Sequence, residues 1–446
     1  MFNIQLTINM HKRLYYFLYL IFIAACSRNA TLDNFFTNAT PYEKYKHSLE
    51  KTQLDQTALG ADWVKAGEIS LHDSLLVALP YSEAGYFSPE KPTALCLQYQ
   101  VREGQKILIT LEALSQPDAI FFMDVFEVIN DTSFQRIQAA DTIPRLAYEV
   151  EKSGWHAIRI QPELLRGGAF LLNMRFEPSL SFPVQGKASS AVGSFFGDPR
   201  DGGKRAHRGI DIFAPKGTPV LAASDGVVGR VTQNRLGGKV VWLHSLKKRF
   251  TQYYAHLDSQ AVRPGQRVVI GDTIGFVGNT GNASTTPPHL HFSIYKLGSG
   301  AVDPYPFVHA LLEEAPAVQF DSSQIGIPAR TKAIWSNVRH SPTTQSPIQG
   351  SYPKHTLVNI EGKSDRWYRI TLPNAQRGYM HDSLIESIDQ PTDAIELTDN
   401  DRFYFDFTDK AIHGNLIAGT SKVVAAFDTL LYIQTPQGYY GWISER

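Results

Sequence analysis

Cysteine is scarce in this chain: two residues in 446 exclude a disulfide framework and a zinc cluster built from thiolates. Net charge is absent as well, because 43 Lys and Arg balance 43 Asp and Glu. That balance excludes the chain-wide basic field through which proteins bind nucleic acid without sequence preference. With 43% hydrophobic residues, and a length that suggests about three domains of roughly 150 residues, the chain can bury several cores.

The apolar run near the N-terminus is too short to be a membrane span. It extends over 12 residues from Leu14 to Ala25, whereas a transmembrane helix needs about 20. His11, Lys12 and Arg13 precede the run and small residues end it, which is typical of a secretory signal.

The end of this run, Ile23-Ala24-Ala25-Cys26, resembles the lipobox of bacterial lipoproteins. The resemblance implies that residues 1–26 carry a lipoprotein signal, with cleavage before Cys26 and a lipid anchor on that cysteine. An ordinary cleaved signal is the alternative. Ser27 argues, by analogy with sorting rules in other bacteria, against retention in the inner membrane. We expect a lipid anchor in the outer membrane on its periplasmic side, although the sequence does not identify which face the anchor occupies.

Beyond residue 26, composition and turn residues divide the chain into five parts. They are a polar helix or stalk (27–66), a strand-rich segment (67–178), a Gly- and Val-rich segment with six of the fourteen histidines (187–310), a second strand-rich segment (325–387) and a tail of similar style (396–446). The pattern predicts a mainly β protein.

Segment 67–178 is predicted to be an N-terminal β-sandwich, because short strand-like runs alternate there with Gly, Pro, Asn and Asp. In its last run, Phe170, Leu172, Met174 and Phe176 are expected on one face. The pattern resembles the jelly-roll-like accessory domains of secreted bacterial peptidases. It leaves open whether the segment binds a partner or acts as a spacer.

The chemistry of segment 187–310 is concentrated in HRGID, YYAHL and HLHF. Gly209, the β-branched Ile210 and Ile212, and Pro215 disfavour a helix at the first motif. In strands, spacings of four and of two residues return to the same face. We therefore expect two paired strands to bring three imidazoles and one carboxylate together, from His207, Asp211, His289 and His291.

Two imidazoles and one carboxylate form a familiar catalytic zinc set with a water in the fourth position. Bound zinc lowers the pKa of that water to about 7, and a neighbouring histidine can take its proton or stabilise the oxyanion. Taken singly, each of these histidines is more often a packed or surface residue, so the prediction depends on the combination.

The stretches RAHRGIDIFAPKGTPVLAASDGVV, YAHL and GFVGNTGNASTTPPHLHF resemble the lysostaphin/LytM-type zinc metallopeptidases. That family comprises peptidoglycan endopeptidases with a mainly antiparallel β-fold. The resemblance implies that His207, Asp211 and His291 bind Zn²⁺ and that His256 and His289 assist catalysis. TTPP before His289 departs from the Gly-Pro that is common there, which affects loop shape and no ligand.

Segment 325–387 resembles bacterial Src-homology-3-like domains through Asn337-Val338-Arg339, Asp365-Arg366-Trp367-Tyr368 and Gly378-Tyr379-Met380. Such domains often bind cell-wall peptides, so a role in holding the polymer is one hypothesis and a packing module is the other. Gly441-Trp442-Ile443 repeats the last of these patterns and suggests a second small β-barrel over 396–446.

Together these features predict a cell-envelope zinc metalloendopeptidase that cuts peptide cross-links of peptidoglycan through a zinc-activated water. Peptidoglycan and, through Cys26, a membrane are the expected partners; nucleic acid is not. The alternative is a non-catalytic activator of another cell-wall hydrolase, and a non-haem iron oxygenase is a third reading of two histidines and one carboxylate. The sequence does not identify the bond that is cut.

Overall fold

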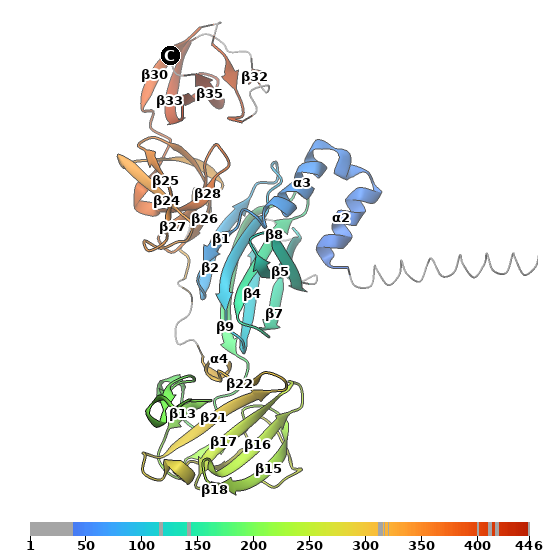
Figure 1. The fold of residues 1–446 in the computed structure, drawn as a ribbon. Helices are drawn as coiled ribbons and strands as arrows, with labels where there is room; N and C mark the ends of the chain where they lie inside the picture. Colours follow the sequence, from blue (N-terminus) through green and yellow to red (C-terminus); the bar gives the residue numbers. More distant parts are fainter. Residues whose placement is uncertain are drawn as a thin grey trace, which may run out of the picture.

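The computed structural model describes residues 39–444 apart from 116–118, 141–143, 311–314, 316, 320, 399–400, 409–412 and 415–418. The predicted signal segment and Cys26 lie outside the described residues. The described chain is mainly β, as predicted, and its β units follow one another along an elongated molecule (Figure 1). Within the described part of the chain, every helix is too short or too polar to cross a bilayer.

Two facing sheets form a sandwich in the middle of the molecule. One sheet has the order β1-β3-β8-β5-β6 and the other contains β2-β9-β4-β7. The bounds are β1 Leu75–Val77, β2 Tyr81–Phe87, β3 Leu95–Val101, β4 Gln105–Ala113, β5 Phe121–Asn130, β6 Ser133–Ala139, β7 Arg145–Glu149, β8 Gly154–Pro162 and β9 Gly168–Pro178.

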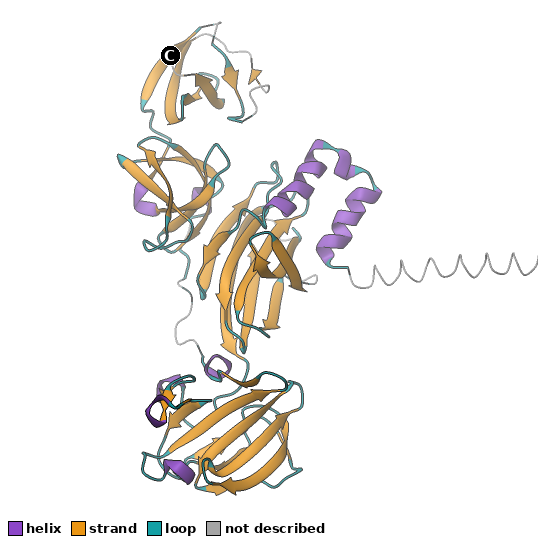
Figure 2. Cartoon of the chain, in the orientation of Figure 1, coloured by secondary structure: helices purple, strands orange, loops and turns teal. Residues whose placement is uncertain are grey.

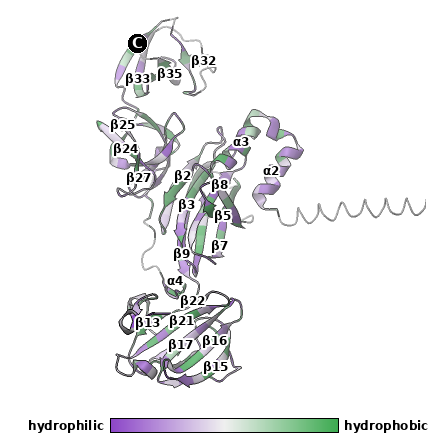
Figure 3. Ribbon diagram, viewed as in Figure 1, coloured by the Kyte–Doolittle hydropathy of each residue, from purple (hydrophilic) through white to green (hydrophobic). Residues whose placement is uncertain are grey.

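The core of the sandwich follows the predicted alternation. Phe170, Leu172 and Met174 are fully buried between the sheets and Phe176 packs against them, while Arg175 is exposed. Hydrophobic residues accordingly lie along the sandwich strands (Figure 3). Cys96 on β3 is buried, as expected for a small apolar residue, and burial raises the pKa of its thiol to about 12.

Two helices cover the outer side of the β1-β3-β8-β5-β6 sheet: α2 (Pro41–Lys51) and α3 (Ala58–Ile69), joined by the 3₁₀ turn Leu54–Gln56 (Figure 2). Thr40 caps α2 in a capping box with Glu43. The Nε1 group of Trp63, 1% exposed, donates to the carbonyl of Pro162 at 2.8 Å. These contacts fasten the helices to the sandwich.

The unit after the sandwich has an eight-stranded antiparallel sheet in the order β10-β13-β21-β17-β16-β15-β19, with β22 beside β21. A three-stranded sheet, β14-β20-β18, packs against it over a shared core, and β11 pairs with β12. The bounds are β10 Val192–Ser194, β11 Pro199–Arg200, β12 Arg205–Ala206, β13 Ile210–Phe213, β14 Pro219–Leu221, β15 Gly226–Asn234, β16 Gly238–Ser245, β17 Phe250–Leu257, β18 Ser259–Gln260, β19 Arg267–Val268, β20 Thr273–Phe276, β21 His289–Lys296 and β22 Gly300–Val302. Three 3₁₀ turns (Ser189–Ala191, Asp201–Gly203 and Gly281–Ala283) and helix α4 (Tyr305–Val308) complete the unit.

A small β unit follows and shares a sheet with the sandwich, because β26 pairs with β2 through Gly362 opposite Gly85. Its strands are β23 Ile327–Thr331, β24 Trp335–Arg339, β25 Ile348–Pro353, β26 Leu357–Ser364, β27 Trp367–Thr371, β28 Arg377–His381 and β29 Ile385–Ser387, with 3₁₀ turns at Ser322–Gln324 and Asp382–Leu384. Trp367 and Tyr379 belong to the buried core of the sandwich. These two residues of the Src-homology-3-like motifs therefore join the two units.

The last unit is a six-stranded sheet in the order β30-β33-β34-β35-β31-β32, with buried clusters that include Trp442 and Ile443. Its bounds are β30 Asp393–Leu397, β31 Phe403–Tyr404, β32 His413–Gly414, β33 Gly419–Phe427, β34 Leu430–Gln434 and β35 Tyr440–Ser444. It lies at the far end of the molecule from the β13–β21 unit (Figure 1).

Candidate metal centre

Strand alternation carries two of the predicted residues to one face of the eight-stranded sheet. On β13, Ile210 and Ile212 are fully buried in the core, so Asp211 between them points to the other face. Leu290 on β21 is buried in the same core, which places His291 beside Asp211 on the opposite face. The antiparallel register pairs Asp211 directly with His291.

His207 reaches this face by a different route from the one the sequence predicts. The prediction that His207 and Asp211 lie on one strand is wrong, because β12 ends at Ala206 and β13 begins at Ile210. Gly209 lets the intervening loop approach β21 closely, since a Cβ there would lie 2.4 Å from the carbonyl oxygen of Phe292. Local loop shape, rather than strand period, therefore brings His207 over the sheet.

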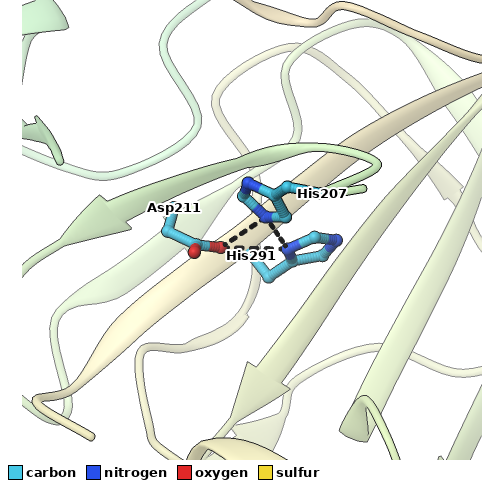
Figure 4. Close-up of side chains that lie close together, drawn as sticks. All are labelled: His207, Asp211 and His291. Carbon is cyan, nitrogen blue, oxygen red and sulfur yellow. Dashed lines mark hydrogen bonds and ion pairs between the residues drawn. The ribbon is translucent and has the colours of Figure 1, made fainter. Parts of the chain in front are cut away.

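One potential metal-ligand atom from each of His207, Asp211 and His291 points toward the same place (Figure 4). Nδ1 of His291 lies 2.9 Å from Oδ1 of Asp211 and 2.9 Å from Nε2 of His207, and that Nε2 lies 3.1 Å from Oδ1 of Asp211. Asp211 and His207 are buried and His291 is partly buried.

This donor set fits a zinc ion. Imidazole nitrogen and carboxylate oxygen are zinc ligands, and a tetrahedral site with bonds of about 2.0–2.1 Å separates its ligand atoms by about 3.3 Å. The observed separations are close to that value. Two imidazole nitrogens and a carboxylate oxygen pointing at one another also form an electron-rich cluster that a cation stabilises.

Backbone and hydroxyl groups orient both imidazoles. Nδ1 of His207 donates to the carbonyl of Phe195 at 2.9 Å, so Nε2 is left with its lone pair toward Asp211. In His291, Nε2 contacts Oγ of Ser293 at 2.8 Å, which leaves Nδ1 as the atom that faces the cluster and can bind a metal. Such outer contacts fix tautomer and ring orientation in metal sites.

Arg200 holds the carboxylate. Its Nη2 lies 2.8 Å from Oδ2 of Asp211, while Oδ1 faces the histidines. Burial acts to raise the pKa of Asp211, but His207 and His291 outweigh it and hold that pKa well below its ordinary value. Burial also lowers the pKa of His291. The cluster thus combines an ionised carboxylate with a neutral imidazole.

His256 and His289 lie next to the cluster, as the sequence predicts. The centroids of their rings are 5.0 Å apart, and Nε2 of His289 lies 3.9 Å from Oδ1 of Asp211. Each Nδ1 donates to a backbone carbonyl, that of Thr280 for His256 and that of Pro287 for His289, at 2.9 and 2.8 Å. Each Nε2 is therefore free to accept a proton.

The environment of His256 keeps its imidazole neutral. Burial, followed by the neighbouring His291 and His289, lowers the pKa of His256 to about 4. Its backbone adopts φ 61°, a left-handed conformation that is uncommon outside glycine and recurs at functional sites. A backbone hydrogen bond from its N–H to the carbonyl of Gly237, 2.7 Å long, holds this turn.

Three contributing residues were not predicted from the sequence: Arg200, Ser293 and Phe195. Ser293 had a usable signal, because it follows His291 by two residues on the same strand and so shares its face. Arg200 comes from the short strand β11 and the carbonyl of Phe195 from the loop after β10, and no local sequence pattern indicates either contact.

Comparisons with known proteins match two regions of the chain. Residues 205–304 match the family described as Peptidase family M23, and residues 334–386 match the family described as Bacterial SH3 domain. His207, Asp211, His256, His289 and His291 all lie within the first match.

Curated relatives align over the same part of the chain. The L-Ala--D-Glu endopeptidase of Bacillus subtilis (strain 168) is 36% identical over 141 residues, which are 29% of this chain and 43% of the relative. The peptidoglycan DD-endopeptidase ShyC of Vibrio cholerae is 44% identical over 94 residues, 21% of each chain. The chain thus spans less than half the length of these relatives.

Among solved structures, the catalytic domain of lysostaphin from Staphylococcus simulans is 34% identical to this chain, with a TM-score of 0.25. The similarity covers 27% of this chain and 93% of that domain.

Proposed function

We propose that this chain, whose residues 205–304 form an M23 peptidase domain, is a cell-envelope endopeptidase that hydrolyses peptide cross-links of peptidoglycan. The observation that carries the proposal is the convergence of His207, Asp211 and His291, with their donor atoms 2.9–3.1 Å apart. The named activities of the M23 relatives support the choice of substrate. Residues 334–386 add a bacterial SH3 domain.

His207, Asp211 and His291 would hold the zinc ion of this family through Nε2, Oδ1 and Nδ1. When bound, zinc supplies Lewis acidity, which polarises a carbonyl and makes water acidic near neutral pH. Arg200 keeps Oδ2 of Asp211 occupied, so that Oδ1 alone is presented to the ion. Ser293 holds the ring of His291 in the orientation that exposes Nδ1.

His256 and His289 would move protons. Both have Nδ1 bound to a carbonyl, so Nε2 is the atom that can accept a proton from the attacking water and return it to the leaving amine. A pKa lowered to about 4 keeps His256 unprotonated at neutral pH, in the form that can act as a base. His289, 3.9 Å from Asp211 Oδ1, is placed to stabilise developing negative charge once it is protonated.

Mass spectrometry of muropeptides after incubation with the zinc-loaded chain tests the proposal. Cross-linked dimers should be converted to monomers, and the masses of the products identify the bond that is cut. His289→Ala should retain zinc and abolish conversion. His244→Ala, an exposed histidine on β16 outside the cluster, serves as the matched control and should convert dimers at the normal rate. Intact dimers with the zinc-loaded wild type would instead favour an activator of another hydrolase.

We further propose that Cys26 carries the lipid that anchors the protein to the outer membrane on its periplasmic side. The lipobox-like sequence before Cys26 and the serine after it support this proposal. Metabolic labelling with a tritiated fatty acid should mark the wild type and not Cys26→Ser. Cys96→Ser, whose cysteine is buried in the sandwich, should remain labelled. Labelling of Cys26→Ser would contradict the anchor.

A further inference from the structure

A cavity of about 730 Å³ lies where three units of the protein meet. Its walls come from the sandwich, from helix α4 and His309 after it at the end of the β13–β21 unit, and from the small β unit that contains Trp367. None of the predicted metal-site residues lines it. We call it the junction cavity, and its volume is in the range of sites for small molecules.

Contacts between the three units hold the walls of the junction cavity in place, so the cavity exists before any ligand binds. Gly104 of the sandwich packs on the ring of Phe307 of α4, so closely that a Cβ there would lie 2.3 Å from the ring. Lys296 of β21 is 2.6 Å from the carboxylate of Glu103 in the same turn. On the other side, the backbone N–H of Leu76 donates to the carbonyl of His340 at 3.2 Å. The three walls are thus tied to one another.

Aromatic rings from all three units line the junction cavity: Trp155 on β8, Tyr305 on α4 and Trp367 on β27. Trp155 is 40% exposed, so part of its ring is accessible from the cavity. Gln100 sits directly opposite Trp155 in the β3–β8 register and also lines the cavity. An aromatic face therefore stands beside an amide that can donate and accept hydrogen bonds.

The remaining polar lining is mostly neutral. It consists of hydroxyl and amide side chains from Ser82, Gln105, Ser341, Thr343 and Ser364. Arg102 and Asp365 are the cation and the anion of the lining, and their charges cancel. Burial and the charge of Arg102 lower the pKa of His309, so this residue adds no charge at neutral pH.

We propose that the junction cavity binds the glycan strand of peptidoglycan, as a neutral chain of N-acetylated sugars. Aromatic rings pack against the C–H faces of sugars, while hydroxyl and amide groups bond to ring hydroxyls and N-acetyl groups. The peptide stems of the same polymer carry carboxylates, for which a lining without net charge offers no complementarity. This inference rests on the proposed function for its choice of polymer.

One chain of contacts joins the junction cavity to the candidate metal centre. Tyr305, which lines the cavity, packs edge-on against Phe195 with ring centroids 5.2 Å apart. The carbonyl of Phe195 accepts the hydrogen bond that orients His207. A sugar in contact with Tyr305, whose ring also stacks on His309, would therefore lie two residues away from a predicted zinc ligand, and would hold the glycan strand near the peptide that is cut.

Tryptophan fluorescence of the chain without residues 1–26, titrated with tetra-N-acetylchitotetraose, tests the proposal. His289→Ala, which is expected to keep zinc and lose cleavage, is used as the background, so that binding is measured apart from cleavage. We expect saturable quenching, and we expect Trp155→Ala to raise the Kd at least about tenfold. Trp335→Ala removes a 63% exposed tryptophan of the small β unit that does not line the cavity, and should leave the Kd unchanged.

A second variant controls for misfolding of the first. Thr343 is exposed at the cavity wall, so Thr343→Trp fills the cavity without disturbing a core and should also raise the Kd at least about tenfold. Two results overturn the proposal: no saturable binding of the sugar up to about 10 mM, or equal binding by wild type, Trp155→Ala and Thr343→Trp. Cavity-dependent binding of a synthetic stem peptide in place of the sugar overturns it as well. Failure of dimer conversion in the muropeptide assay leaves this result unaffected.

Discussion

Arg200 contacts one oxygen of the Asp211 carboxylate and leaves the other to the histidines. Nη2 of Arg200 lies 2.8 Å from Oδ2, while Oδ1 faces His207 and His291. A buried carboxylate with both oxygens free could rotate and present either one. The arginine removes that freedom and so preorganises a single ligand atom.

Replacing Arg200 by methionine should therefore weaken zinc binding while the fold is kept. Loss of an outer partner of a metal ligand typically costs about 10- to 100-fold in affinity. Competition against a fluorescent zinc chelator measures the dissociation constant. Arg230→Met, on β15 outside the cluster, is the control and should leave zinc affinity at the wild-type value. Equal affinities of wild type and Arg200→Met would contradict a positioning role for the arginine.

Gly209→Ala should disturb the loop that carries His207. The new Cβ would lie 2.4 Å from the carbonyl oxygen of Phe292 and 2.9 Å from Cε1 of His291, and backbone cannot yield to such contacts. We expect a loss of about 1–3 kcal/mol in the unfolding free energy of the β13–β21 unit, together with weaker zinc binding. Gly154→Ala, where a Cβ meets nothing within 4 Å, should change neither quantity in a urea titration.

The buried pair of Glu83 and Arg369 should be essential to the joint between the sandwich and the small β unit. Glu83 is fully buried, and Nη2 of Arg369 lies 3.0 Å from its Oε1. Arg369 also pairs with Glu361 at 2.7 Å, so Arg369→Met would leave the buried carboxylate of Glu83 without its counter-charge, at a cost of about 3–5 kcal/mol. Arg366→Met removes an exposed pair with Asp382 and should cost at most about 1 kcal/mol. Urea unfolding followed by tryptophan fluorescence compares the two, and equal costs would contradict the prediction.

Acid should destabilise the sandwich through His156. Burial lowers the pKa of this residue to about 4, whereas in the unfolded chain it is about 6.5. As the pH falls from about 6.5 to 4, the unfolded state therefore takes up a proton that the folded state does not, and stability drops by about 3 kcal/mol. His156→Gln should lose that part of the pH dependence, while substitution of the exposed His47 should not. Superimposable stability–pH curves for wild type and His156→Gln would show the expectation to be wrong.

The sequence predicts those features that depend on residues close together in the chain, and misses those that depend on contacts between distant segments. Phe170, Leu172 and Met174 could be assigned to one buried face because strand alternation is local. The same alternation placed Asp211 and His291 correctly. It failed for His207, because the loop through Gly209 is shaped by its contact with β21, and spacing carries no information about that contact.

Longer-range features were outside the reach of sequence patterns. The pairing of β2 with β26 joins segments on either side of the β13–β21 unit, so the sequence pattern presents the small β unit as a separate module. The sequence pattern assigns Trp367 and Tyr379 either to a cell-wall-binding motif or to packing, and the structure places both in the core of the sandwich. Arg200, on the two-residue strand β11, and Phe195, in the loop after β10, take positions that depend on the completed fold.

The most direct test of the account is the zinc content of purified variants, measured by mass spectrometry of the metal after dialysis. We predict one zinc ion per chain for wild type, His244→Ala and His289→Ala, and essentially none for Asp211→Ala. A full complement of zinc in Asp211→Ala, or in His207→Ala with normal cleavage of muropeptides, would contradict the claim that these side chains hold the catalytic ion.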